Sequence, residues 1–338
     1  MTGYGRLFIA VAVILLLLPL PAYISPPTQE TPPPPPPTDD VDGGAPSAPT
    51  DSDTETAAVF RVLCGDEVVS LDERDFLIRT LAMEMSPATH EEALKAQTVA
   101  AYTYYARRRE AQSKKADPDL KGADFATPND KFPNEYSEEK LRERWGKQYD
   151  ENYAKIAAAV EAVHGVTITH NGALIDAVYH AISSGSTESA DTVWGSDVPY
   201  LQAVASPGDR LSQGFESESR HTVEEVRTIL TRELPDVALG DDPTSWFGEP
   251  TLSAAGTVAQ QPIGDRQLAG TRVRQLFGLR SAAFTVTYAE SAFTFAVRGY
   301  GHGVGMSQHG ADYLAQQGYT YDEILRYYYT DVEVNLPR

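Results

Sequence analysis

The sequence has 338 residues, and its 28 Lys and Arg are outnumbered by 48 Asp and Glu, which gives a formal net charge of −20. An acidic surface repels phosphate backbones, anionic membrane surfaces and anionic wall polymers, so these are excluded as main ligands and neutral substrates are favoured. Cys64 is the single cysteine. An intrachain disulfide and the cysteine clusters of structural zinc sites are therefore excluded.

Residues 1–25 predict a membrane segment. Positions 7–24 are apolar throughout apart from two prolines, and Arg6 supplies the only nearby positive charge. We expect a short cytoplasmic N-terminus and an uncleaved transmembrane anchor, although the length also suits a cleaved signal peptide. Residues 26–57 are rich in Pro and then in Asp, Gly and Ser, which predicts a disordered linker. Residues 58–338 would then form one folded domain outside the cytoplasm, held at the cell membrane by a single span.

The folded part begins near Val59 with two short predicted strands, 59–63 and 67–71. Residues 72–85 predict a helix, which ends there because Pro87 disfavours helical backbone at the residue before it. Thr89 and Glu92 resemble a capping box for a second helix that runs to about residue 112. Small residues along this helix permit close packing by a neighbouring element. Residues 114–136 predict a long surface loop.

Residues 137–164 predict a third helix. Residues 166–170 and 173–182 predict the two strands of a hairpin, because an Asn-Gly pair joins them. Residues 183–201 then form a long loop rich in hydroxyls, acids and aromatics. Loops of that length within a domain are usually functional or disordered.

Two capping boxes, Thr222 with Glu225 and Thr320 with Glu323, predict the starts of two later helices. The remaining elements are a short helix over 270–279, a hairpin over 282–288 and 292–297, a Gly-rich loop over 299–305, a helix before Gly318 and a last strand. The whole pattern predicts an α+β fold, with mixed helices and β-hairpins around one active-site cleft.

Glu84 is the first candidate catalytic residue. It lies at the end of the first predicted helix, and Leu77 and Leu81 fall on the same helical face. A carboxylate on an apolar stripe is costly to bury, which favours a raised pKa and an acid role. The alternative is that Glu84 points into water or pairs with Lys95.

The Gly-rich loop matches no phosphate-binding pattern. Its glycines either let backbone approach a ligand or form a tight turn. His302 and His309 match no zinc spacing, so structural or substrate-contact roles are expected. Ser183 and Ser184 lack the sequence context of a nucleophile and are interpreted as hydrogen-bonding residues.

Trp194 and Tyr200 lie in the long loop over residues 183–201. They either stack on sugar faces or anchor that loop.

Four motifs occur together: Glu84-Met85, LKAQTVAAYTY from residue 94, SSG…TES…VWG…PYL over 183–201, and RGYGHGVGMSQHGA from residue 298. With them the chain resembles the stage II sporulation protein D family, which includes amidase-enhancer domains. The resemblance covers about residues 59–334. It implies a peptidoglycan lytic transglycosylase that cleaves the MurNAc-β-1,4-GlcNAc bond of peptide-stripped glycan and leaves 1,6-anhydro ends.

The resemblance also implies Glu84 as the single general acid and base. We expect no cofactor and no metal. It implies action in sporulation, during forespore engulfment, in the space between the mother cell and forespore membranes. The implied partners are an amidase, stage II sporulation protein P, and a membrane protein, stage II sporulation protein M. Motif position and side-chain chemistry add the expected substrate-binding residues: Ser183, Ser184, Gly185, Glu188, Tyr200, His302, Gln308 and Gln97.

Two positions depart from the family pattern. Many members carry Arg where this chain has Tyr102, which puts any charge-dependent role there in doubt. Some members hold zinc in the segment that corresponds to residues 114–136, where this chain has no Cys, so we expect no such zinc. The alternative function is a non-catalytic, glycan-binding amidase enhancer, and a third is a plain tether in the cell wall.

Overall fold

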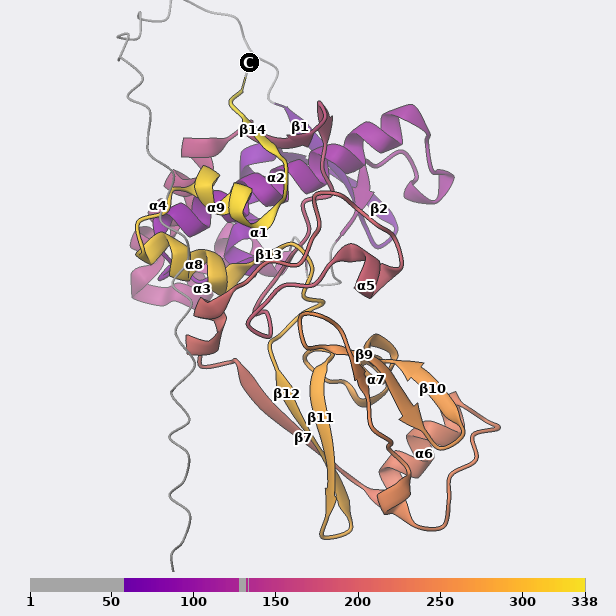
Figure 1. Cartoon of the computed structure of the whole chain (residues 1–338). Coiled ribbons are helices and arrows are strands. Elements are labelled where there is room, and N and C mark those ends of the chain that lie inside the picture. Colours follow the sequence, from indigo (N-terminus) through magenta and orange to yellow (C-terminus); the bar gives the residue numbers. More distant parts are fainter. Residues whose placement is uncertain (1–57, 128–131, 133, 338) are drawn as a thin grey trace, which may run out of the picture. The chain divides into compact units, whose positions relative to one another are not determined.

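A computed structural model describes residues 58–127, 132 and 134–337 (Figure 1). The predicted membrane segment and linker, residues 1–57, lie outside these residues. Within the described part of the chain, no helix is both long and apolar enough to cross a membrane. The described residues form an α+β fold of helices and several small sheets, as the sequence pattern predicted.

The first elements follow the prediction closely. Strands β1 (Val59–Cys64) and β2 (Glu67–Asp72) pair antiparallel. Helix α1 (Glu73–Glu84) follows at once, because the Asp72 carboxylate accepts hydrogen bonds from backbone N–H groups of its first turn. The segment predicted as a surface loop contains a third strand, β3 (Phe125–Ala126), which pairs parallel with β1.

Helix α2 (Glu91–Lys114) is the longest described helix, and its predicted cap is wrong. The cap is His90, whose Nδ1 accepts the Glu92 N–H at 3.3 Å, and not Thr89. The Glu92 carboxylate does not return to the cap. It accepts the backbone N–H of Tyr321 at 2.7 Å, which joins the start of α2 to a helix far along the chain.

The third predicted helix, 137–164, is wrong as a single element. It is divided into α3 (Glu138–Trp145) and α4 (Tyr149–Val163), joined by a short 3₁₀ turn. Gly146 lies at the break with a φ of +52°, outside helical backbone. Helical spacing continues across such a break in the sequence, so periodicity alone did not reveal it.

The predicted hairpin is correct only near its turn. Strands β4 (Thr167–His170) and β5 (Ala173–Leu174) pair antiparallel. The rest of the predicted second strand, 173–182, leaves the hairpin. Its β6 (Tyr179–His180) pairs parallel with β13 (Met306–Ser307) from the Gly-rich tail. This long-range pairing has no local sequence signal.

The first hydrophobic core surrounds α2, which packs against α4, α8 (Gln308–Gln316) and α9 (Tyr321–Tyr328). Figure 1 shows α8 and α9, in yellow, beside α2. The small residues of α2 allow this approach, since Ala93, Ala96 and Ala100 are fully buried. The predicted capping box of α9 is confirmed, because the Glu323 carboxylate accepts both the backbone N–H and the hydroxyl of Thr320. The last strand, β14 (Glu333–Asn335), pairs with β4.

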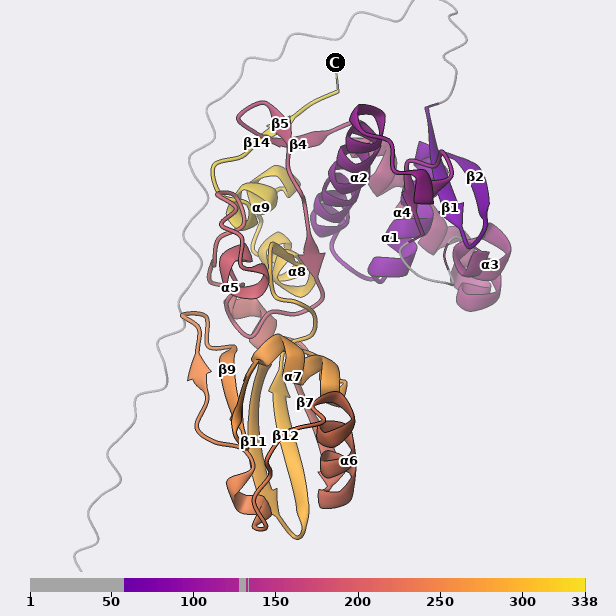
Figure 2. The same ribbon diagram turned by 90° about the vertical axis from the view of Figure 1, so that its right-hand side faces the viewer.

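A second hydrophobic core lies in the segment from residue 216 to residue 298 (Figure 2). Its sheet has the order β11-β12-β7, with β11 (Ala283–Ala289) and β12 (Ala292–Arg298) forming the predicted hairpin. Strand β7 (Glu216–Thr222) was not predicted, and it pairs antiparallel with β12.

Two helices and a smaller sheet complete this second core. Helix α6 (Val223–Glu233) begins at the predicted capping box of Thr222 with Glu225, which is confirmed. Helix α7 (Gly270–Phe277) follows β10 (Arg266–Ala269). The smaller sheet has the order β10-β9-β8, with β9 (Val258–Ile263) in the middle and β8 (Thr251–Leu252) at one edge.

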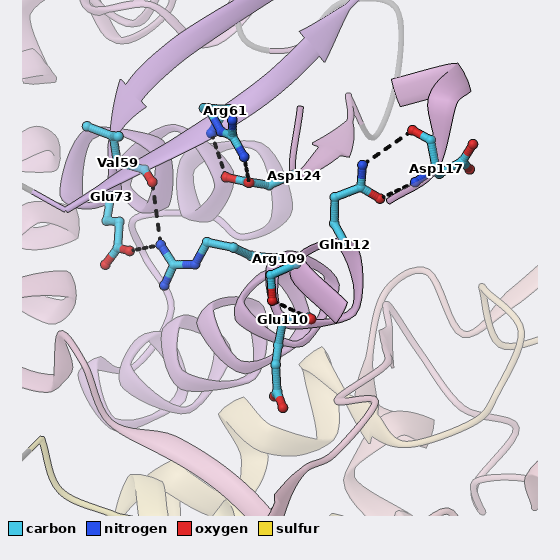
Figure 3. A network of polar contacts seen from close by, with 9 residues as sticks. Val59, Arg61, Glu73, Arg109, Glu110, Gln112, Asp117 and Asp124 are labelled. Atoms are coloured by element: carbon cyan, nitrogen blue, oxygen red, sulfur yellow. Dashed lines mark hydrogen bonds and ion pairs between the residues drawn. The ribbon is translucent and has the colours of Figure 1, made fainter. Parts of the chain in front are cut away.

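A polar network fixes α1 against the far end of α2 (Figure 3). Glu73, at the start of α1, is only 2% exposed and pairs with Arg109 of α2. The same guanidinium donates to the Val59 carbonyl at 3.4 Å, and a second pair joins Arg61 to Asp124 at 3.0 Å. A buried carboxylate needs such a partner. This network holds one end of α1, and Glu84 lies at the other.

Candidate active site

Glu84 is the last residue of α1, and its surroundings follow from the apolar face of that helix. Leu77 and Leu81 are each 1% exposed, as their spacing predicted, and Met85 is buried. The helix ends because Met85 takes extended backbone, with a φ of −134° and a ψ of 150°. Glu84 therefore lies on the buried face of α1, at the end of the helix.

The Glu84 carboxyl lines a cavity of about 190 Å³. The walls come from the α1–α2 connection, from the residue after β6, and from the first turns of α8. The lining residues are Glu84, Met85, Ser86, Thr89, Ala181, Gln308, His309 and Asp312.

One glutamine amide holds the carboxyl group, and a second glutamine contacts the first. The Nε2 of Gln308 donates to Glu84 Oε2 at 3.2 Å and contacts Gln97 Oε1 at 3.4 Å. Gln308 is 7% exposed and Gln97 is fully buried. The Nε2 of Gln97 is buried and has no hydrogen-bond partner among the described residues. The structure thus brings together three of the residues that the sequence nominated.

Burial raises the pKa of the Glu84 carboxyl, and the hydrogen bond from Gln308 opposes that rise. Among the described residues, Glu84 forms no ion pair with a Lys or Arg. The alternative pairing with Lys95 is wrong, because Lys95 pairs with Glu91 at 3.4 Å and with Glu92 at 2.6 Å. The Glu84 site therefore favours the protonated acid.

Asp312 is a second carboxylate in the lining of this cavity, and the sequence analysis did not single it out. Its Oδ1 accepts the backbone N–H of His90 at 2.7 Å, and its Oδ2 accepts the Gln316 amide at 2.8 Å. The first contact joins the start of α2 to α8, and the second lies within α8. This arrangement gives Asp312 a structural task.

Asp209 is a buried residue that the sequence analysis also missed. Its carboxylate accepts the Ser183 backbone N–H at 3.0 Å and the Ser307 hydroxyl at 2.7 Å. Ser307 in turn caps α8, since its Oγ accepts the Gly310 N–H at 3.2 Å. Burial raises the pKa of Asp209, and these hydrogen bonds lower it. Asp209 therefore joins the 183–184 segment to the helix that presents Gln308.

Four further predicted residues line a different cavity, of about 120 Å³: Ser183, Ser184, Glu188 and His302. The predicted residues are therefore divided between two cavities. The segment after β6 separates them, because Ala181 lines the Glu84 cavity and Ile182 lines the other one.

Glu188 is 2% exposed in this second cavity. Its Oε1 accepts the Thr257 hydroxyl at 2.6 Å and also the Ser253 hydroxyl. These two hydroxyls belong to the segment that connects β8 to β9. Glu188 thus joins the long loop to the second core.

Gly185 and Tyr200 line neither cavity. A Cβ at Gly185 would lie 2.7 Å from Arg210 Nε, so a side chain there would displace that guanidinium. The Tyr200 hydroxyl accepts the Asp176 N–H at 3.1 Å, and its ring centroid lies 5.5 Å from that of His170. Tyr200 has the contacts of a loop anchor.

Trp194, unlike Tyr200, is exposed and does not anchor the loop. It ends α5 (Ala190–Trp194), and it is 47% exposed. Its ring centroid lies 5.4 Å from that of His302. This exposed indole is not buried as a loop anchor would be, and it lines a third cavity together with His302.

The Gly-rich loop owes its glycines to close packing against β6. A Cβ at Gly305, where φ is +72°, would lie 2.2 Å from the Val178 carbonyl oxygen. At Gly301 it would lie 2.6 Å from the Cβ of His180. These glycines therefore let protein backbone approach protein backbone, and this contact presents His302 and Gln308 on either side of β13.

Two histidines lie close together beside this loop. The ring centroids of His180 and His302 are 5.7 Å apart. Burial is the largest cause that lowers the pKa of each, to about 3 for His180 and about 4 for His302, so both are neutral near pH 7. No group of three or more His, Cys, Asp or Glu among the described residues is arranged to hold a metal ion.

Tyr102, the position where the sequence departs from the expected family pattern, contacts Glu73 and Arg109 and does not line the Glu84 cavity. Burial and the nearby Glu73 carboxylate raise the pKa of its hydroxyl. The ring centroid of Tyr102 also lies 6.2 Å from that of Phe60. In this chain the position contributes to packing between α1, α2 and β1.

A partly buried carboxyl at a helix end, held by a neutral amide in a cavity, defines a candidate acid–base site in an α+β domain. The sequence model described as stage II sporulation protein matches residues 66–170, which include Glu84. Stage II sporulation protein D of Bacillus subtilis (strain 168) is 33% identical over 278 residues, or 82% of this chain and 78% of that protein. Its counterpart in Bacillus amyloliquefaciens is 34% identical over 269 residues, or 79% and 75%.

The chain therefore belongs to the stage II sporulation protein D family. It is also similar to a Bacillus subtilis (strain 168) protein named amidase enhancer, with 26% identity over 294 residues. That match covers 73% of this chain and 38% of the amidase enhancer. These relatives bear out the resemblance that the four sequence motifs indicated.

Proposed function

We propose that this protein is a peptidoglycan lytic transglycosylase that cleaves glycan strands after their stem peptides have been removed. The observation that supports the proposal most strongly is the environment of the Glu84 carboxyl group. Its carboxyl lines a cavity, burial raises its pKa, and a neutral amide holds it at 3.2 Å. A general acid that works near neutral pH needs these properties.

In the proposed reaction Glu84 acts twice. As an acid it protonates the glycosidic oxygen between MurNAc and GlcNAc, and the bond from that oxygen to the anomeric carbon breaks. As a carboxylate it then takes the proton from the MurNAc 6-hydroxyl while that oxygen attacks the anomeric carbon. The product is a 1,6-anhydro sugar, water is not consumed, and Glu84 regains its proton.

The engagement of Asp312 favours this reaction over hydrolysis. Most glycosidases use two carboxyl groups, one of which activates water or attacks the sugar directly. In the Glu84 cavity the second carboxylate accepts hydrogen bonds on both oxygens, from His90 and Gln316. Glu84 is therefore the carboxyl group that is available for proton transfer.

The proposal extends to place and partners. A family member in sporulation would act outside the cytoplasm, held at the cell membrane by the predicted segment over residues 1–25. Its substrate would come from an amidase such as stage II sporulation protein P, with stage II sporulation protein M as membrane partner. The lactyl carboxylates are the only charges of peptide-free glycan, so a chain with a net charge of −20 needs a local cation where it binds one.

The test uses the purified full-length protein alone with amidase-treated peptidoglycan. We expect 1,6-anhydro ends to accumulate with time, detected by mass spectrometry. Peptidoglycan that has not met the amidase is the control and should yield far fewer such ends. Complete absence of 1,6-anhydro products from the treated glycan would contradict the enzymatic proposal.

One observation favours a second candidate, a glycan-binding amidase enhancer: the relative that carries that name. Such a protein would stimulate a purified amidase and release no 1,6-anhydro product by itself. Measuring both activities on one protein preparation separates the two candidates. A plain wall tether would show neither activity.

A further inference from the structure

The third cavity, which Trp194 and His302 line, is a groove separate from the Glu84 cavity and has a volume of about 560 Å³. Trp194 from α5, Arg274 from α7 and His302 from the Gly-rich loop line it. Arg274 and His302 also line the smaller cavity of Ser183 and Ser184, so the two hollows share walls. A volume of this size is within the usual range of ligand sites.

Arg274 is half-buried, and among the described residues it forms no ion pair with a carboxylate. Its Nε donates to the Leu279 carbonyl at 3.3 Å. Two residues away on the same helix, Arg272 pairs with Glu233 at 2.8 Å. In a chain with 48 acidic and 28 basic residues, an arginine without an acidic partner is informative. A desolvated cation is costly unless an anion or hydrogen bonds compensate it.

Among the described ionisable groups, only Tyr300 acts on the pKa of the Arg274 guanidinium, by raising it, and no carboxylate does so. His302 is neutral near pH 7, because burial and then Arg274 itself lower its pKa to about 4. Glu188 lines the adjoining cavity, and its Oε1 is engaged by Ser253 and Thr257. Burial lowers the pKa of the Arg274 guanidinium, which remains a cation at neutral pH. The groove therefore offers a positive charge beside an exposed indole.

We propose that this groove binds a muramic acid residue of the glycan strand, with Trp194 against the sugar face and Arg274 paired with the free lactyl carboxylate. An aromatic face suits the apolar side of a sugar ring, and a guanidinium binds a carboxylate through two parallel hydrogen bonds. The inference rests on the proposed function for the identity of the glycan and names the chemical group that this groove selects.

The lactyl group carries this charge only after another reaction. While the stem peptide is attached, the lactyl carbonyl is part of an amide and is neutral. Hydrolysis of that amide consumes one water, leaves a carboxylate on the sugar and releases the amine of the peptide. An amidase-type reaction must therefore supply the substrate, and Arg274 recognises its product.

Binding to two glycan preparations tests the inference in the full-length protein carrying Glu84→Gln, so that cleavage does not intervene. The first preparation is amidase-treated glycan. The second is the same glycan with its carboxyl groups chemically reduced to alcohols. We expect binding to the first to be about tenfold tighter, the effect of one charge-assisted contact.

Arg274→Gln should abolish that tenfold preference and bind both preparations with equal affinity. The matched control is Arg272→Gln, which removes the same charge from the exposed side of the same helix and should keep the preference. Trp194→Ala should weaken binding to both preparations alike. Arg274→Lys, which keeps the charge, should retain part of the preference, and thermal melting checks that each variant is folded.

A preference that survives in Arg274→Gln would overturn the inference, and so would equal binding of both glycans by the parent protein. Loss of folding in Arg274→Gln leaves the Arg274→Lys comparison to decide. The outcome is independent of the cleavage assay, because a protein that binds carboxylate-bearing glycan without cleaving it would contradict only the enzymatic proposal.

Discussion

The Glu84 cavity and the Trp194–Arg274 groove differ in the charge that each one buries. In the cavity a carboxyl group is held by Gln308 and, through it, contacts Gln97, and both of these side chains are neutral amides. In the groove a guanidinium lies beside a neutral histidine and an exposed indole. The cavity holds a partly buried acid with no cation beside it, and the groove holds a half-buried cation with no ion-paired acid.

This difference teaches how one acidic chain can separate proton transfer from recognition. A cation beside Glu84 would stabilise its carboxylate and lower its pKa, which would weaken it as an acid. A neutral amide orients the carboxyl group with a smaller effect on the pKa. Recognition of a carboxylate needs the opposite arrangement, a cation, and this chain holds that cation in another cavity.

The largest expected effect comes from Glu84, and the other carboxyl group of its cavity, Asp312, provides the comparison. Glu84→Gln should lower the rate of 1,6-anhydro product formation by at least about 10²–10⁴-fold, the usual contribution of a general acid or base. Asp312→Asn should keep the rate within about tenfold, because its oxygens have a structural task. Equal losses in both variants would indicate a two-carboxylate mechanism.

Gln308→Leu should have the next largest effect. Loss of the amide frees Glu84 to rotate, and we expect the rate to fall by about tenfold or more. Because the Gln308 hydrogen bond lowers the pKa of Glu84, its removal should raise that pKa further. Activity requires the protonated acid, so the alkaline limb of the pH–rate profile should move to higher pH.

Gln317→Leu, at an exposed position at the end of α8, is the control for this experiment and should leave the profile in place. A Gln308→Leu profile that moves to lower pH would contradict the proposed role of the amide.

Asp209 joins the helix that presents Gln308 to Ser183, which lines the smaller cavity next to the groove. Asp209→Ala leaves the Ser183 N–H and the Ser307 hydroxyl without their buried acceptor. We expect a loss of about 1–3 kcal/mol in the free energy of unfolding, measured by denaturant titration. Ser307→Ala, which removes one of these donors and the α8 cap, should lose a comparable amount. The double variant should lose less than the sum, because the residues share one network.

A smaller effect concerns stability and pH. The pKa of Glu84 is raised in the folded state, so stability from this group is complete below its unfolded pKa, near 4.5, and is lost as pH rises through the folded pKa. Glu84→Gln has no ionisable group at this position, so the variant does not lose stability in this way as pH rises. Its melting temperature should exceed that of the parent at neutral pH, and the difference should shrink in acid. The control Glu139→Gln, an exposed residue of α3, should show no such trend.

Local sequence signals predicted much of the fold where one short pattern determines the backbone. The capping boxes of Thr222 and Thr320 mark the starts of α6 and α9, and alternation predicted the β11–β12 hairpin. The apolar face of α1 predicted the buried surroundings of Glu84. Each of these features depends on residues within a few positions of one another.

Features that depend on distant contacts were not predictable in this way. The parallel pairing of β6 with β13 joins residues more than 120 positions apart, and Asp209 meets Ser307 across 98 positions. The Gly146 break interrupts a helical pattern that continues on both sides. The exposure of Trp194 and the unpaired charge of Arg274 also follow from tertiary packing, which composition and spacing do not encode locally.

The measurement that tests the central claim most directly is the fate of water in the reaction. Amidase-treated glycan is incubated with the full-length protein in water enriched in ¹⁸O, and the new ends are analysed by mass spectrometry. If Glu84 alone transfers the proton and the MurNAc 6-hydroxyl attacks, the new ends are 1,6-anhydro sugars without the label. New reducing ends that carry one ¹⁸O atom would contradict the account, because they would mean that an activated water had attacked the sugar.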